Sequence, residues 1–323
     1  MQIDFCNGKS YDILNDYLRN TFLYPRTKAR NKENGNIAAI EEINLLSEDY
    51  PRKQLKCIEI MRHLDHENIL NRFSIHYKNE KYFLVTEYLL CDLHEVIYSN
   101  CPLENNDFKL IIYQVLQGLY ALHSAGIVHN HICPQAIWIN EDCDVKFADF
   151  WFATEINKEY NDIITDWTIC APEIICKAPA ITGKADIWSC GWLLYELVAR
   201  RKSVLLKRSL FSTLIGIICK IGKPNEDDMF FVEDKYFKKL SSLQASESQN
   251  IIEHDDKLLI DLLNKMLAFN PLKRWDAEKC LQHPYFEEIL EYFPIPSKIP
   301  DLFDWDILNK KIPREEIPKM VDL

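Results

Sequence analysis

The sequence predicts a two-lobed α+β fold in which a small β-rich part, residues 1–90, precedes a larger helical part. Up to about residue 90, apolar residues fall in short runs of strand-forming types, and beyond it they recur at helical spacing. The join near Glu87–Cys91 lacks a linker rich in Pro, Gly or Ser. Two packed lobes are therefore expected rather than two independent domains.

In the first part, two short runs predict strands and one longer run predicts a helix. The strand candidates, Ile37–Ile43 and Lys81–Thr86, are rich in Ile, Val, Thr and aromatic residues. Between them, Arg52–Leu64 has the pattern of a helix. In the second part, apolar residues recur at helical spacing over Leu110–Leu122, and Ile187–Val198, apolar on every side, predicts a wholly buried helix.

Composition limits the functions that the chain can have. With 323 residues it can bury a large core without disulfides or metals, and its net charge of −11 argues against binding nucleic acid or anionic membranes. Eleven cysteines without a Cys-x-x-Cys pair argue against a zinc ribbon or a disulfide framework. The first residues, Met1–Gly8, lack the basic and apolar regions typical of a signal sequence, and no apolar run approaches the ~18 residues that span a bilayer. We expect a cytoplasmic protein without membrane insertion, with cytoskeletal or nuclear association left open.

Glycine is scarce, with eight residues in 323, whereas about 7% is usual. None of the eight lies between Arg19 and Arg26, and none stands at the position directly after Phe150. A mechanism that cradles phosphates in a glycine-rich loop is therefore in doubt from the start.

Several segments, taken in order, resemble the landmarks of protein kinases. They are the third-strand motif at Ala38–Ile43, the catalytic loop at His129–Ala136, the metal-binding triplet at Asp149–Trp151, the end of the activation segment at Ala171–Glu173, the central helix start at Asp186–Gly191, and the closing element at Asn270–Arg274. The resemblance covers nearly the whole chain. It implies a bilobal protein-kinase-like fold with an N-lobe (1–90), a C-lobe (91–290) and a C-terminal extension (291–323).

Three further segments resemble mitogen-activated protein kinases, with cyclin-dependent kinases as the nearest rival. They are Phe211–Pro224, Leu262–Pro271 and the tail from Phe303 to Glu316. The tail favours the mitogen-activated group.

The resemblance also implies that the catalytic positions are degenerate. Glu41 stands at the phosphate-binding lysine and Cys57 at its glutamate partner. In the catalytic loop, His131 replaces the base aspartate, Cys133 the lysine that steadies the phosphate, and Ala136 the asparagine metal ligand. His131 could act as a base in principle, but it lacks the groups that would hold a substrate. No residue is therefore expected to be catalytic, and Cys57 and Cys133 are expected to be inert.

At Glu41 the change reverses a charge. At ~4 Å and an effective dielectric of about 20, exchanging attraction for repulsion is a swing of about 8 kcal/mol. We expect the carboxylate either to turn toward solvent or to pair with a basic neighbour such as Arg19 or Arg26.

Nucleotide and metal sites are not expected to function either, so no cofactor is expected. Asp149 is the only retained metal ligand, and Trp151 replaces the glycine that lets this triplet move. We expect Trp138 to fill the adenine pocket. The former nucleotide-site positions are Arg19, Thr21, Tyr24, Ala39, Thr86, Leu89 and Trp138.

Regulatory positions are lost as well. The family's two phosphoacceptors fall on Asn161 and Ile163, and the arginine that would receive the phosphate falls on Asn130. Thr154 is one of the hydroxyl residues that remain in the segment.

Structural positions, in contrast, are retained. Met61, His129 and Phe150 match an internal apolar stack, and Asp186 matches the residue that anchors the catalytic loop. Glu173 and Arg274 match a buried ion pair. Since the losses fall on chemistry and the retentions on shape, the sequence predicts a pseudokinase that works by binding unidentified protein partners, as a scaffold, an allosteric partner or a component of an assembly.

Two alternatives remain from the same resemblance. One is a divergent active Ser/Thr kinase that uses ATP and magnesium, His131, and a displaced lysine such as Lys28 or Lys32. The other is a nucleotide-binding switch without catalysis.

Overall fold

The structure, a computed structural model, describes most of the chain and divides into two compact units. Unit 1 holds the described residues up to Asp92, those of 137–151, and Trp305; unit 2 holds those of 93–136 and from 152 to 300. The described residues are 2–5, 8–17, 26–43, 51–70, 73–79, 81–100, 102–140, 142–158, 169–178, 182–201, 209–243, 251–300 and Trp305. The proposed tail resemblance lies outside them, apart from Trp305.

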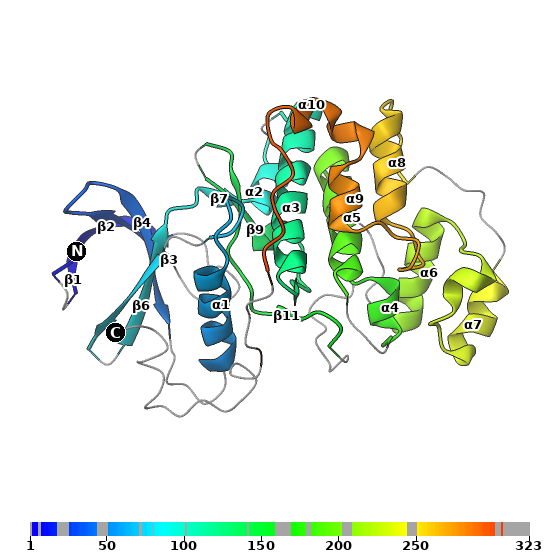
Figure 1. The fold of residues 1–323 in the computed structure, drawn as a ribbon, viewed down its shortest axis with the longest axis horizontal. Coiled ribbons are helices and arrows are strands. Elements are labelled where there is room, and N and C mark those ends of the chain that lie inside the picture. The colour runs from blue at the N-terminus through cyan, green and yellow to red at the C-terminus, as the bar shows by residue number, and fades with distance from the viewer. Residues whose placement is uncertain are drawn as a thin grey trace. The chain divides into compact units, whose positions relative to one another are not determined.

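Unit 1 contains a six-stranded antiparallel sheet with the order β1-β2-β3-β4-β6-β5 (Figure 1). Its strands are β1 (Gln2–Asp4), β2 (Ser10–Tyr17), β3 (Arg26–Asn31), β4 (Ile37–Ile43), β5 (Phe73–Lys78) and β6 (Lys81–Glu87). Helix α1 spans Pro51–His63. Both predicted strands and the predicted helix are confirmed, with ends that differ by at most one residue.

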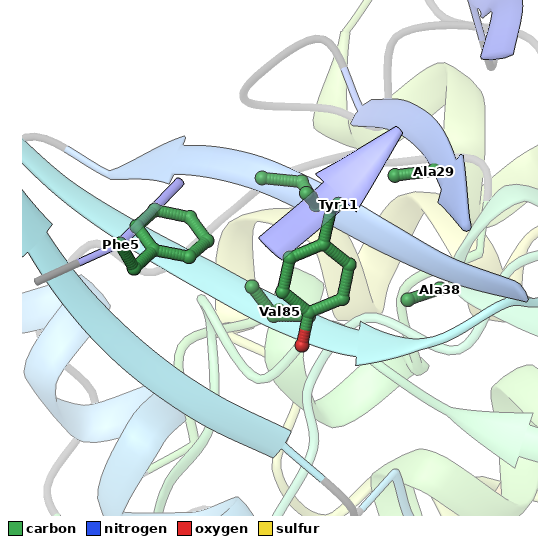
Figure 2. Close-up of a cluster of buried hydrophobic side chains, with 6 residues drawn as sticks. Phe5, Tyr11, Ala29, Ala38 and Val85 are labelled. Carbon is green, nitrogen blue, oxygen red and sulfur yellow. The ribbon is translucent and has the colours of Figure 1, made fainter. Parts of the chain in front are cut away.

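Side chains alternate between the two faces of this sheet, as the pleat requires. One face carries a buried apolar cluster, shown in Figure 2. Its members are Phe5, Tyr11, Ala29, Ala38, Ile40 and Val85. The Phe5 ring stacks on His76 with centroids 4.3 Å apart. The opposite face carries Glu41, Ile43 and Leu84, which border a cavity together with side chains of α1.

A second, three-stranded sheet of unit 1 has the order β10-β9-β7. Its strands are β7 (Cys91–Asp92), β9 (Ile137–Ile139) and β10 (Val145–Phe147). The Leu70 backbone N–H donates to the Phe147 carbonyl at 2.9 Å, and Asn68 donates its side-chain amide to Val145 O at 3.0 Å. These bonds fix the strand that leads into Asp149 against the segment that follows α1.

Unit 2 is helical, apart from a short ribbon of β8 (Ile127–Val128) and β11 (Thr154–Glu155). Its helices are α2 (Leu93–Tyr98), α3 (Asn105–Ser124), α4 (Pro172–Ile175), α5 (Lys184–Ala199), α6 (Leu210–Ile221), α7 (Asp234–Ser241), α8 (Lys257–Met266), α9 (Ala277–Leu281) and α10 (Glu287–Leu290), with 3₁₀ turns η1 (Pro134–Ala136), η2 (Glu226–Met229) and η3 (Pro284–Phe286). Both predicted helices are confirmed, within α3 and α5. The small strand-rich part and the larger helical part confirm the predicted α+β class.

Helix α5 forms the centre of unit 2. Its Trp188 and Trp192 side chains are among the largest fully buried ones, and their rings meet edge to face at 6.1 Å. The segment after α10 runs beside α3, where Tyr113 donates its hydroxyl hydrogen to Phe293 O at 2.6 Å (Figure 1). Among the described residues, no helix is both long enough and apolar enough to cross a membrane.

Candidate functional site

An ion pair occupies the position that the resemblance to kinases assigns to the phosphate-binding lysine. Arg26 on β3 lies opposite Glu41 on β4 in the sheet register, and its Nε donates to Glu41 Oε2 at 3.0 Å. The two side chains are only 8% and 12% exposed. The expected pairing of Glu41 with a basic neighbour is thus confirmed for Arg26, and the alternative of a carboxylate turned to solvent is wrong.

The same guanidinium lies over an indole ring. The Arg26 Cζ is 5.2 Å from the ring centroid of Trp138, within the range of a cation–π contact. Trp138 is itself buried, on β9. Arg26 therefore contacts both the former lysine position and the predicted floor of the adenine pocket.

Burial raises the pKa of Glu41, the nearby Asp149 carboxylate raises it further, and Arg26 opposes the rise. The charged form of this carboxylate is stabilised in the sheet chiefly by Arg26, since desolvation disfavours an unpaired charge. Any ligand that drew Arg26 away would leave Glu41 buried without its counter-ion.

A cavity of about 50 Å³ lies next to the pair. It is lined by Arg26, Glu41, Ile43, Gln54, Cys57, Ile58, Met61, Leu84, Ala148, Asp149 and Trp151. Gln54, Cys57 and Met61 project from α1 at spacings of three and four residues, so they share one helix face. Burial raises the pKa of the Cys57 thiol to about 12, which keeps it protonated and unreactive at neutral pH.

Hydrogen bonds hold the triplet after β10 in place. The Trp151 backbone N–H donates to Asp149 Oδ1 at 3.0 Å, and the Trp151 carbonyl accepts from Lys56 Nζ on α1 at 3.1 Å. The Trp151 side chain is buried, with 6% of the residue exposed. One of the Asp149 oxygens is therefore already engaged with the chain's own backbone.

These residues do not fit magnesium and a nucleotide in the way that kinases hold them. Arg26 is paired with Glu41, and the resemblance leaves Asp149 as the one retained metal ligand. Among the former nucleotide-site positions, Ala39, Thr86, Leu89 and Trp138 are all buried. The loop positions Arg19, Thr21 and Tyr24 lie outside the described residues. The part of the chain that the structure describes holds no group of three or more His, Cys, Asp or Glu side chains suited to a metal.

The catalytic-loop region, in unit 2, is anchored by Asp186 on α5. Its carboxylate accepts from the backbone N–H groups of His129 and Asn130, both at 2.8 Å, and it contacts His123 Nε2 at 2.9 Å. The anchoring role predicted for Asp186 is confirmed. Gly183 lies against the His123 ring, where a Cβ would come within 2.7 Å of it.

His131, at the base position, is buried and already in contact. Its Nε2 is 3.4 Å from the Cys133 Sγ, its backbone N–H donates to His129 Nδ1, and its ring lies 5.0 Å from that of Phe152. Cys133 and Ala136 form a small buried cluster with Ile169. The loop is therefore packed, and the His131 imidazole contacts Cys133 and Phe152.

Asn130, at the phosphate-receiving position, ties two segments of unit 2 together. Its backbone is left-handed, with φ of 63°, a conformation that Asn tolerates better than most residues. Its Nδ2 donates to Phe152 O at 3.1 Å and to Thr154 Oγ1 at 2.8 Å. Thr154 is buried, so its hydroxyl is closed to modification in this structure. Asn161 and Ile163 lie outside the described residues.

The predicted buried ion pair of the helical part is confirmed. Arg274 donates from Nη1 to Glu173 Oε1 at 2.6 Å and from Nη2 to Oε2 at 2.9 Å. Of the predicted apolar stack, Met61 and Phe150 are buried in unit 1 and His129 in unit 2.

Sequence reasoning missed three residues of these sites. They are Gln54, Lys56 and His123. Gln54 and Lys56 stand three residues and one residue before Cys57 on α1, so the spacing alone could have placed Gln54 on the same face. For His123, no sequence signal indicated the contact with Asp186.

Comparison with known proteins covers most of the chain. A family model for the protein kinase domain matches residues 26–286. Mitogen-activated protein kinase 6 of Oryza sativa subsp. japonica is 30% identical over 309 residues, which cover 91% of this chain and 81% of that protein. Mitogen-activated protein kinase 13 of Arabidopsis thaliana is also 30% identical, over 91% of this chain and 84% of that protein. The chain therefore belongs to the protein kinase family and is similar to its mitogen-activated members.

Proposed function

We propose that this protein is a catalytically inactive member of the protein kinase family that acts by binding another protein. The observation that carries the proposal is the buried Arg26–Glu41 pair at the former lysine position. It places a carboxylate where a nucleotide needs a cation, and it commits the nearest guanidinium to that carboxylate.

Energetics support this reading of the pair. To use Arg26 for a phosphate, the protein would have to break the pair and leave Glu41 buried alone, which costs about 3–5 kcal/mol in buried pairs. An unpaired Glu41 would also repel the phosphates at about 4 kcal/mol per unit charge at ~4 Å and an effective dielectric near 20. Together these terms offset the binding free energy of about 8 kcal/mol that a micromolar nucleotide would supply.

The loop of unit 2 gives independent support. A base must reach the acceptor hydroxyl, directly or through one water, and His131 is buried against Cys133 and Phe152. In the family, a lysine steadies the transferring phosphate and an asparagine binds a metal ion. Neither residue is present at its position in this loop, so nothing would hold a phosphate near the imidazole.

The proposed partner is an unidentified protein, and binding is proposed to take place in the cytoplasm. Candidate docking surfaces are the exterior of the helical unit, the activation segment and the C-terminal extension. Large apolar side chains are exposed on two of these surfaces: Leu272 at 79% and, where the extension begins, Tyr292 at 77%. Exposed apolar groups of this size favour protein contacts.

Thermal denaturation with nucleotide tests the inactive reading. The melting temperature of the full chain should stay unchanged on addition of ATP with magnesium or manganese, because a ligand stabilises only the state that binds it. A rise of several degrees would overturn the proposal. Cross-linking in the native cells should then capture a defined protein partner, and recovery of none would count against the binding role.

A divergent active Ser/Thr kinase is the alternative, and two observations favour it. Asp149 is retained, and the similar proteins are named as mitogen-activated protein kinases. Radiolabelled autophosphorylation that disappears in Asp149→Ala would establish this alternative, with ATP and magnesium as cofactors. A melting shift without phosphate transfer would instead indicate a nucleotide-binding switch.

A further inference from the structure

The turn between β3 and β4 carries an asparagine that is followed by a glycine. Asn34 and Gly35 are both exposed at the tip of this hairpin. Gly35 has a left-handed backbone, with φ of 76°, and it has no side chain that would crowd its backbone nitrogen. An attack by this nitrogen on a neighbouring group is therefore not hindered by the residue itself.

A hydrogen bond holds the Asn34 side chain close to this backbone. The Asn36 backbone N–H donates to Asn34 Oδ1 at 2.9 Å, which curls the side-chain amide toward the two residues that follow, as in an Asx turn. The same bond draws electron density from Cγ, the side-chain carbonyl carbon, and stabilises negative charge that develops on the oxygen. Asn34 thus presents a polarised carbonyl carbon to the chain just ahead of it.

From this arrangement, we propose that Asn34 is a site of spontaneous deamidation, with water as the co-reactant. Hydroxide removes the Gly35 N–H proton, and the nitrogen attacks Cγ of Asn34. As the new N–Cγ bond closes a cyclic succinimide, the bond from Cγ to the side-chain nitrogen breaks, and this nitrogen takes up a proton and leaves as ammonia. Water then adds to either carbonyl of the succinimide and opens the ring, which leaves aspartate or isoaspartate at residue 34.

One hydrogen bond opposes the reaction in the folded chain. The Gly35 N–H donates to Asn31 O at 2.8 Å, so the turn must open locally before the nitrogen loses its proton. Opening of an exposed hairpin tip requires much less free energy than global unfolding. Loss of one ordinary hydrogen bond corresponds to a rate about fivefold lower than in the unfolded chain.

The same turn contains an internal control. Asn36 is also exposed, but it precedes Ile37, whose β-branched side chain crowds the nitrogen that would attack. We expect conversion at Asn34 to be clearly faster than at Asn36.

Conversion changes both the charge and the backbone of the tip. It adds a carboxylate next to Glu33. The isoaspartyl product also inserts a carbon into the main chain, which disturbs the bonds from Gly35 N–H to Asn31 O and from Asn31 N–H to Asn36 O. Deamidation should therefore loosen the β3–β4 hairpin. The inference goes beyond the proposed function and does not depend on whether the chain transfers phosphate.

Incubation of the purified full chain at neutral and mildly alkaline pH, followed by peptide mass spectrometry, tests the site. Asn34 should gain the mass that corresponds to exchange of NH for oxygen, with aspartyl and isoaspartyl forms and release of ammonia. The rate should rise in proportion to the hydroxide concentration, because the deprotonated nitrogen is the nucleophile. In urea the rate should be about fivefold higher, since the bond to Asn31 is lost.

Gly35→Ala should slow the conversion severalfold in urea, where strain of a Cβ residue at φ of 76° has no influence. Gly8→Ala, in the other Asn-Gly pair of the sequence, is the matched control and should leave the rate at Asn34 unchanged. Conversion of Asn36 as fast as that of Asn34, full protection of Asn34 in the folded chain, or an unchanged rate in Gly35→Ala would overturn the proposal.

Discussion

Arg26 and Glu41 face each other across β3 and β4 and form an ion pair with side chains only 8% and 12% exposed. The pair joins the two strands at the position where the resemblance of this chain to protein kinases predicts a lysine that contacts a nucleotide phosphate. A buried pair of this kind contributes little net stability, but removal of one partner leaves the other charge uncompensated. Its integrity can therefore be tested by changing one member at a time.

Arg26→Met should lower the free energy of unfolding by about 3–5 kcal/mol, because Glu41 would remain buried without its counter-ion. Loss of Arg26 removes the interaction that opposes the raised pKa of Glu41, so this pKa should rise further. A carboxyl group whose pKa is raised in the folded state makes the protein less stable as pH increases above 4.5, the ordinary pKa of this group. Urea denaturation of the variant across that range measures both effects.

The double variant Arg26→Met/Glu41→Leu controls for the charge. It should recover to within about 1 kcal/mol of the natural chain or exceed it, since apolar replacement of a buried pair is often neutral or stabilising. If the single and double variants were equally destabilised, packing rather than charge would explain the loss.

Gln54→Leu should increase stability by about 1–3 kcal/mol, because it removes a buried amide with no hydrogen-bond partner in the described structure. Differential scanning calorimetry should show a melting temperature several degrees higher in the absence of added ligand. A lower melting temperature would mean that the amide has partners in solution.

His76 should make the stability of unit 1 depend on pH. Burial lowers the pKa of this imidazole to about 4, with a smaller contribution from Lys9. A histidine that is harder to protonate when folded binds more protons when unfolded, so stability falls as pH decreases from 6.5 toward 4.

His76→Phe should flatten this part of the stability profile while keeping a ring stacked on Phe5. Denaturant midpoints at pH 4, 5 and 7 would give the slopes of both proteins, with pH values chosen around the ordinary pKa of about 6.5. Parallel slopes would show that other groups cause the acid sensitivity.

The fold was predictable where periodicity was strong. The strand Ile37–Ile43 and the helices within α3 and α5 follow directly from spacing and apolar content. Strand β1, by contrast, has only three residues and carries no periodic signal. Its place at the sheet edge comes from antiparallel hairpin pairing with β2, and three residues are too few to show the alternating pattern of a strand.

The candidate site was predictable in identity but less so in geometry. The resemblance to kinases predicts that Glu41 replaces the phosphate-binding lysine, and the sequence offers Arg19 and Arg26 as its basic neighbours. Arg26 pairs with Glu41 because the β3–β4 register places the two residues opposite each other. The unpartnered amide of Gln54 was not predictable, because satisfaction of a buried group depends on every neighbour in three dimensions.

Glu173→Gln should destabilise the protein by about 3–5 kcal/mol, since it leaves the fully buried Arg274 without a countercharge. Glu278→Gln is the matched control. Glu278 pairs with Lys298 at 3.3 Å, but the two side chains are 44% and 66% exposed, so its loss should stay below about 1 kcal/mol. Guanidinium denaturation would measure the free energy of unfolding of both variants. An equal loss in the two would contradict the explanation from burial.

Asn130→Ala should destabilise unit 2 by about 2–3 kcal/mol, because it removes the bonds to Phe152 and Thr154 and places a Cβ residue at φ of 63° without compensation. Asn130→Gly removes the same bonds without the backbone strain, so it should lose about 1 kcal/mol less. In both variants, hydrogen exchange over residues 152–155 should accelerate, since the link to β11 is lost. A glycine variant as stable and as protected as the natural chain would show that the Asn130 side chain does not hold this segment.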